Sequence, residues 1–274
     1  MSITKFSSIE DINSTYREKW KNYRTNSLAP EIKEYFDKWP IQYDTNIIKR
    51  DLLFVGLNPS YDDNKKPLQL SNANSLDNQD EIRKAIEDER TAQRGNGDKE
   101  RYSYYSLFPK ICKTLQLDIE DWNHIDLFPF RHRDQYQLVS DFQLDTNISE
   151  WVIGGNTKKD IIKDCVSIFL GLVEYLKPKV IVVVNGFISK KIMENTGSYY
   201  VDGYRNPIIT TQTENEDFNL YLPKNLNECH RILKIRNEYP LLLSSMLTGQ
   251  RALDLGSRER LIWHIRQILV SQYD

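Results

Sequence analysis

Short apolar runs alternate with longer amphipathic stretches along this chain, and the alternation predicts an α/β fold. The runs cover residues 51–57, 124–128, 179–184 and 240–244, and each is followed by Asn, Pro or Ser. Runs of this length between turn residues are typical of buried strands in a parallel sheet. Because amphipathic stretches separate them, we predict a three-layer α/β/α fold with a central, mainly parallel four-stranded sheet.

Apolar residues at spacings of three and four predict the helices that cover this sheet. Ser8 and Asn156 suit the N-cap positions of two such stretches, and Pro30 suits the first turn of another. Gly95 ends a charged stretch. We expect helices at residues 8–40 (two helices), 81–94, 101–116, 157–176, 187–194 and 259–272.

The helical and strand patterns divide the chain into two parts. Residues 1–45 are expected to form an N-terminal helical extension, and residues 46–274 the α/β/α domain. An insertion at about 61–100 interrupts this domain, and its polar first half is long for a connecting loop.

The first predicted strand ends abruptly in residues 56–60, Gly-Leu-Asn-Pro-Ser. In open α/β sheets, ligands bind just beyond the carboxyl ends of the strands, so Asn58 lies where a site is expected. Pro59 stiffens the turn and favours an extended backbone at Asn58. Asn, Pro and Ser are also ordinary turn residues, so a purely structural turn is the alternative.

Together with later segments, this stretch resembles the uracil-DNA glycosylase superfamily. Residues 122–131 are similar to the strand that carries the family's base-reading residue, and residues 176–186 to its third core strand. Residues 242–251 stand at the His-Pro-Ser loop, and residues 256–258 resemble the Gly-x-Arg that opens the last helix. The matches span residues 50–268 in the family's order. They imply a monofunctional DNA glycosylase that flips a base and excises it hydrolytically, leaving an abasic site.

The resemblance assigns catalytic roles to three residues. Asn58 matches the residue that positions the attacking water, and as an amide it can only orient that water by hydrogen bonds. We therefore expect slow turnover. Ser244 or Ser245 stands where the family often has a His that donates to the departing base. Gly56 belongs to the first motif and is expected at the base.

Base choice depends on two departures from the family pattern. Asp126 matches the base-reading Asn, and an ionised carboxylate only accepts hydrogen bonds, which suits the N4 amino group of cytosine. Ser60 matches a position that holds a bulky Tyr in the strict uracil branch, so the pocket has room at C5 of the base. The expected substrate is a C5-modified cytosine in foreign DNA such as phage DNA, which implies antiviral defence. A structural Asp126 and a plain turn at Ser60 are the alternatives.

Further residues are candidates for contacts with the base and the DNA. Tyr104, Tyr105 and Phe108 are candidates to stack on the flipped base, although aromatic residues here also suit a core. Met246 and Leu247 match the apolar wedge that fills the space left by that base, with a core role as the alternative. Phosphate contacts are expected from Arg131, Arg133, Arg251 and Arg258.

The charge and the cysteine content limit which partners and cofactors we expect. The net charge is −2, so a local basic edge rather than a basic surface would hold DNA. Cys112, Cys165 and Cys229 are widely spaced and cannot supply the four thiolates of the cluster that some members of the superfamily carry. We expect no metal, iron–sulfur cluster or other cofactor. No apolar run approaches ~18 residues and no signal region is evident, so we expect a cytoplasmic protein.

Two other functions remain open from the sequence. One is a repair glycosylase for uracil or mismatched thymine. The other is a catalytically weak DNA-binding module that keeps the fold without the chemistry. A nucleotide-binding α/β protein is disfavoured, because the chain has neither a Gly-x-Gly-x-x-Gly stretch nor a Walker A stretch.

Overall fold

A computed structural model gives the fold of the chain. It describes residues 4–26, 28–45, 47, 49–59, 69–96, 100–195, 198–201, 206–209, 220–221, 232–235, 239–247 and 252–271. Of the predicted site residues, Ser60 and Arg251 lie outside these ranges.

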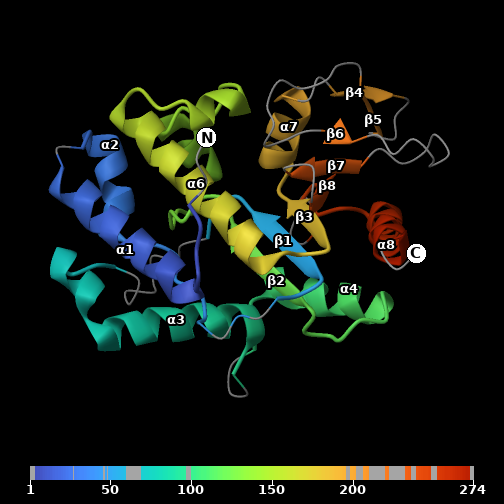
Figure 1. Cartoon of the computed structure of the whole chain (residues 1–274), viewed down its shortest axis with the longest axis horizontal. Coiled ribbons are helices and arrows are strands. Elements are labelled where there is room, and N and C mark those ends of the chain that lie inside the picture. The colour runs from blue at the N-terminus through green and yellow to red at the C-terminus, as the bar shows by residue number, and fades with distance from the viewer. Residues whose placement is uncertain are drawn as a thin grey trace.

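Four parallel strands form the centre of the molecule, as the apolar runs predict (Figure 1). They are β2 (Trp122–Asp126), β1 (Leu52–Gly56), β3 (Val180–Val184) and β8 (Tyr239–Ser244), in that spatial order. Antiparallel β7 (Ile232–Ile235) and β6 (Leu220–Tyr221) extend the sheet beyond β8. A separate hairpin pairs β4 (Ser198–Val201) with β5 (Asn206–Ile209).

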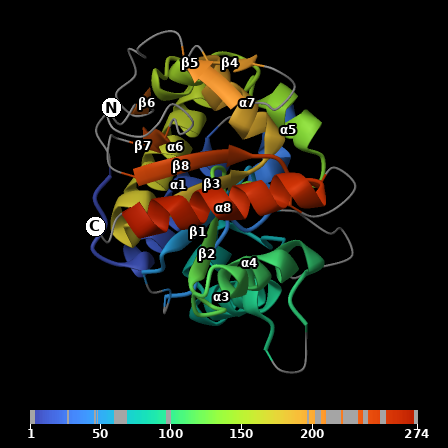
Figure 2. The ribbon, with the colours of Figure 1, turned by 90° about the vertical axis from the view of Figure 1, so that its right-hand side faces the viewer.

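Helices cover both faces of this sheet, which makes the fold a three-layer α/β/α arrangement (Figures 1 and 2). The helices are α1 (Ile9–Thr25), α2 (Pro30–Lys33), α3 (Gln79–Arg94), α4 (Phe108–Thr114), α5 (Gln135–Asp141), α6 (Thr157–Leu176), α7 (Gly186–Asn195) and α8 (Leu255–Ser271). Side chains of α1, α6 and α7 share one core cluster with alternate residues of the strands. The remaining strand residues form a second cluster with α4 and α8.

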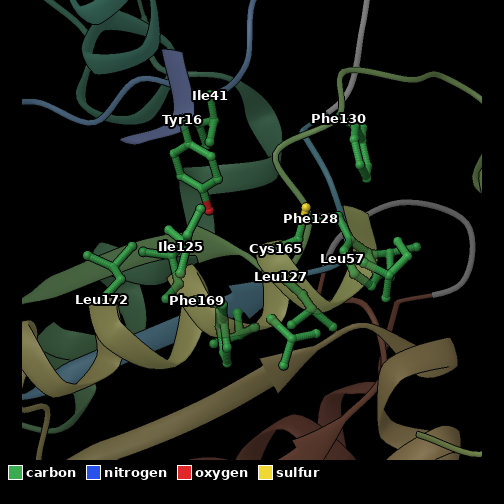
Figure 3. Close-up of a cluster of buried hydrophobic side chains, with 14 of the residues drawn as sticks. Tyr16, Ile41, Leu57, Ile125, Leu127, Phe128, Phe130, Cys165, Phe169 and Leu172 are labelled. Atoms are coloured by element: carbon green, nitrogen blue, oxygen red, sulfur yellow. The ribbon is translucent and has the colours of Figure 1, made fainter. Parts of the chain in front are cut away.

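The packing of α6 illustrates the first cluster (Figure 3). Cys165, Phe169 and Leu172 project from α6 toward Ile125 and Leu127 of β2 and its continuation. All five side chains are buried. Residues three and four apart on α6 therefore pack against alternate residues of the strand, as the sequence predicts.

Caps explain where several helices begin. The Ser8 side chain accepts from the Asp11 backbone, and the Asp11 carboxylate accepts from the Ser8 backbone, which forms a capping box at α1. The Asn156 side chain caps α6 by accepting from the Lys159 backbone. Asp134 caps α5 in the same way, a helix that the hydrophobic pattern did not predict. Both predicted caps are thus confirmed.

Element boundaries differ from the prediction in several places. The helix expected at 101–116 begins only at Phe108, after a 3₁₀ turn at Ser103–Leu107. The second N-terminal helix stops at Lys33 and continues only as a short 3₁₀ turn, Glu34–Asp37. Strand β2 begins and ends two residues earlier than expected, so Asp126 is its last residue. Helix α8 begins at Leu255, four residues early. The shift in β2 matters most, because it places Asp126 directly at the carboxyl edge of the sheet.

The N-terminal helices belong to the same core as the sheet. Ile12, Tyr16 and Trp20 of α1 are fully buried in the cluster that contains Leu53 and Val55 of β1. The indole of Trp20 also donates to the Lys38 carbonyl. Among the described residues, none of the helices combines the length and apolar character that crossing a bilayer requires.

Candidate functional site

The candidate site begins where β1 and β2 end side by side. Gly56 and Asp126 are register partners on these strands. A Cβ on Gly56 would lie only 2.3 Å from Oδ1 of Asp126 and 3.1 Å from Nε2 of His124. Glycine is therefore required here for close approach, because any side chain would displace the carboxyl group.

Asp126 is a buried carboxyl without a compensating cation. Its side chain is 3% exposed, and within the described part of the chain its Oδ2 has no hydrogen-bond partner. Burial raises the pKa of Asp126 well above its usual range, Glu89 raises it further, and Arg131 only partly opposes this. The raised pKa favours the protonated carboxyl, which both donates and accepts a hydrogen bond. The raised pKa disfavours the ionised, acceptor-only Asp126 that the sequence suggested.

Arg131 neutralises a different acid. Its Nη2 lies 2.7 Å from Oε2 of Glu89, and the two side chains are 4% and 7% exposed. Its Nε also donates to the Trp39 carbonyl at 3.0 Å. This buried ion pair fastens the loop after β2 to α3, so the prediction of a phosphate contact for Arg131 is wrong.

Asn58 is fixed by the backbone around it. Its Nδ2 donates to the carbonyls of Phe130 and His132 at 3.2 and 2.9 Å, and to that of Pro59 at 3.2 Å. Because carbonyl oxygens only accept, the amide nitrogen must face them, which leaves Oδ1 as the remaining acceptor. The half-buried side chain thus joins the loops after β1 and β2 and offers one oriented acceptor.

His124 lies beside Asp126 on the same face of β2, and the sequence reasoning did not select it. Its Nδ1 is 4.0 Å from Oδ2 of Asp126, and its Nε2 is 3.3 Å from the hydroxyl of Tyr104. Burial, and then Arg94, lower the pKa of His124 to about 3, so the imidazole is neutral. The spacing of two residues between His124 and Asp126 on a strand was the available signal.

All three aromatic candidates adjoin His124, with ring centroids 5.4 Å away for Tyr104, 5.2 Å for Tyr105 and 5.8 Å for Phe108. Tyr104 is half-buried and touches His124 edge-on. Phe108 is buried and stacks on Phe54 with ring centroids 4.1 Å apart, and Tyr105 is buried against Trp122. Tyr105 and Phe108 are thus core residues, and the stacking role predicted for them stays a prediction.

The segment after β8 is built mainly for packing. Leu247 is 3% exposed and belongs to the cluster beneath α8, so its prediction as a wedge is wrong. Met246 is half-buried, and its carbonyl accepts from the Leu253 backbone at 2.8 Å. Ser244 ends β8 and donates to the Ser245 carbonyl at 3.2 Å. Since β3 separates β8 from β1, these serines lie about 10 Å from Gly56 at the usual strand spacing.

Two predicted phosphate-binding arginines remain accessible. Arg133 is exposed, and Arg258 is partly exposed in the first turn of α8. The structure shows no ion pair to either guanidinium within the ranges it describes. Within the same ranges, no group of three His, Cys, Asp or Glu side chains could hold a metal ion.

No protein-family model matches the chain, and no curated protein matches it. The interpretation of the site therefore depends on its own chemistry.

Proposed function

We propose that the protein is a DNA glycosylase that hydrolyses the N-glycosidic bond of a flipped, C5-modified cytosine. The observation that carries this proposal is the pairing of a buried, protonation-prone carboxyl, Asp126, with an oriented acceptor, Asn58, at one edge of the sheet. One group suits the departing base and the other suits the attacking water. The resemblance of the strand ends to the uracil-DNA glycosylase superfamily supports the same assignment.

Asp126 would bind the base through two adjacent hydrogen bonds. A neutral carboxyl presents one donor and one acceptor side by side. Cytosine presents the complementary pair, because its N3 accepts and its N4 amino group donates. The Asp126 hydroxyl would donate to N3 while its carbonyl oxygen accepts from N4.

The same proton would assist departure of the base. As the bond between C1′ and N1 breaks, its electron pair moves onto the base, and transfer of the Asp126 proton to N3 lets cytosine leave neutral. General acid catalysis of this kind contributes about 10²–10⁴-fold. The water that attacks C1′ loses a proton to solvent, and Asp126 regains one before the next turnover.

Asn58 would hold that water through Oδ1. The sugar passes through an oxocarbenium-like state, so positioning of the water matters more than its activation. An amide does not accept the proton, and we therefore propose a slow enzyme. Tyr104 would line the pocket beside His124.

Single-turnover excision on matched duplexes tests the proposal. The bases are 5-hydroxymethylcytosine, cytosine, uracil and a thymine mismatch, with alkaline cleavage of abasic sites as the readout. We expect fastest release of the modified cytosine. Asp126→Asn should slow that release about a hundredfold while sparing uracil, because an amide binds the base without transferring a proton. Asp80→Asn, at an exposed position on α3, is the matched control.

The second arm concerns Asn58. Asn58→Ala should abolish base release and leave DNA affinity within about twofold, since it removes only the acceptor for water and the loop contacts. Undiminished release by Asn58→Ala would remove this residue from the mechanism. If the wild type releases no base from any duplex, the alternative of a catalytically weak DNA-binding module is favoured.

A repair glycosylase for uracil or mismatched thymine is the second candidate. A neutral carboxyl also matches the O4 acceptor and N3–H donor of uracil once its proton sits on the other oxygen. Release of uracil faster than modified cytosine, unaffected by Asp126→Asn, would favour this function.

A further inference from the structure

A polar cavity lies between α3, β2 and the segment that leads into β1. Its volume is about 100 Å³. Arg50, Arg90 and Arg94 line it together with Tyr43, Asn123 and other side chains. These residues come from α3, from β2 and from the segment that leads into β1. None of them takes part in the proposed base excision.

The two acids on the cavity wall are already committed to cations. Glu89 pairs with Arg131 at 2.7 Å. Asp44 lies 3.6 Å from the guanidinium of Arg90. Neither acid therefore compensates the remaining arginines.

The other arginines near the cavity, Arg50, Arg94 and Arg101, outnumber the carboxylates that pair with them. Arg94 and Arg101 contact the same carboxylate, that of Glu120, at 2.6 and 3.1 Å. Within the described ranges, Arg50 makes no ion pair, and Nη1 of Arg101 is buried without a hydrogen-bond partner. Burial lowers the pKa of Arg94, Glu120 opposes this, and the nearby Arg50 and Arg101 lower it further. An excess of positive charge thus lies at this edge.

Tyr43 also lines the cavity. Its hydroxyl is buried and approaches the backbone of Asp126, so it does not serve as a donor for the cavity. The backbone of Tyr43 is fixed by two hydrogen bonds with the Asn13 side chain, both 2.8 Å long.

We propose that this cavity binds a small oxyanion, either inorganic phosphate or the terminal phosphate of a nucleic acid strand. Guanidinium groups match phosphate oxygens in geometry and charge. The cavity is smaller than the ~300 Å³ at which sites for larger ligands begin, so it suits one phosphate group. Arg50 and Arg94 supply the charge.

Titration calorimetry of the full chain with inorganic phosphate tests the site, with chloride at equal ionic strength as the reference. We expect saturable binding of one phosphate that Arg50→Gln weakens about tenfold or more, as loss of one charge-assisted contact implies. Arg83→Gln changes an exposed arginine of α3 and should leave binding unchanged.

A second arm distinguishes the two sources of phosphate. Oligonucleotides with a 5′-phosphate or a 5′-hydroxyl are compared at one salt concentration. A preference for the 5′-phosphate that Arg50→Gln removes assigns the site to a strand end, and phosphate binding without that preference assigns it to the free ion. Absence of saturable phosphate binding, or binding that Arg50→Gln does not weaken, would overturn the proposal. Either result leaves base excision, measured separately, unaffected.

Discussion

The two ends of β2 carry opposite imbalances of charge. At its carboxyl end, Glu89 and Arg131 neutralise each other, and Asp126 is left buried without a cation. At its amino end, Arg94 and Arg101 share the single carboxylate of Glu120. A carboxyl can lose its charge by taking a proton, whereas a guanidinium cannot lose its charge in the physiological range. The first end therefore favours a neutral donor and acceptor, and the second keeps a positive charge that the proposed anion would balance.

Removing the acid at each end should give the largest effect and separate the two environments. Glu89→Ala leaves the Arg131 charge buried and unpaired, which should lower the free energy of unfolding by about 3–5 kcal/mol. Glu120→Ala acts on a pair that is one-third exposed to water, and we expect a loss of about 1 kcal/mol or less. Urea unfolding measures both. Equal losses would show that the two ends are equally hydrated.

Gly56→Ala tests the close approach at the carboxyl end. The new methyl would overlap Oδ1 of Asp126, so we expect a loss of about 1–3 kcal/mol. Gly186→Ala is the matched control, since a Cβ there meets no atom within 4 Å. Adding Asp126→Ala to Gly56→Ala should restore part of the stability, because it removes the overlapping oxygen. Strictly additive losses would place the carboxyl elsewhere.

The protonation of Asp126 predicts a pH dependence of stability. Its pKa is raised in the folded state, so its contribution is complete below pH ~3.9 and is lost as pH rises toward the folded pKa. His124 acts oppositely, because its pKa is lowered to about 3 in the folded state. Its contribution to stability is complete above its ordinary pKa of ~6.5 and is lost as pH falls toward 3. Above pH ~6.5 His124 no longer changes the unfolding free energy with pH, so of these two groups only Asp126 can do so.

We therefore expect the unfolding free energy of the wild type to fall, relative to that of Asp126→Asn, by up to about 1.4 kcal/mol per pH unit as pH rises from ~3.9 toward the raised folded pKa of Asp126. His124→Gln should instead flatten the acid side, below pH ~6.5. Urea unfolding in buffers of constant ionic strength gives both slopes. Parallel curves for the wild type and Asp126→Asn would mean that Asp126 is ionised at neutral pH.

The sheet and its caps could be predicted from the sequence, because their causes are local. Apolar runs locate β1, β2, β3 and β8, and the first turns of α1 and α6 show their caps directly. The polar residues after β1 and β2 could likewise be placed at one edge, because parallel strands end together. Asn58 therefore follows from pattern alone, whereas Asp126 was selected by the family resemblance, since the expected strand continued to residue 128.

Charge state and partners could not be predicted in the same way. Arg131 and Arg133 look equivalent in the sequence, yet only Arg131 meets Glu89, which lies 42 residues away along the chain. The protonation of Asp126 depends on burial and on that same pair. Leu247 resembles an apolar wedge by position, and only the packing of α8 makes it a core residue. These properties arise from tertiary contacts, which a single sequence does not show.

The smallest expected effect tests which end of β2 faces DNA. Arg133 is exposed just beyond the carboxyl end, and Arg50 lies at the amino end of the adjacent strand. On a duplex with 5′-hydroxyl ends, Arg133→Ala should weaken binding to all sequences alike and lower the salt slope by about one unit. Arg50→Gln should leave that slope unchanged, because a duplex without terminal phosphates offers its cavity no ligand. Fluorescence anisotropy over a range of salt concentrations measures both slopes. If Arg50→Gln lowers the salt slope and Arg133→Ala does not, the DNA would bind at the amino end of β2, away from Asp126.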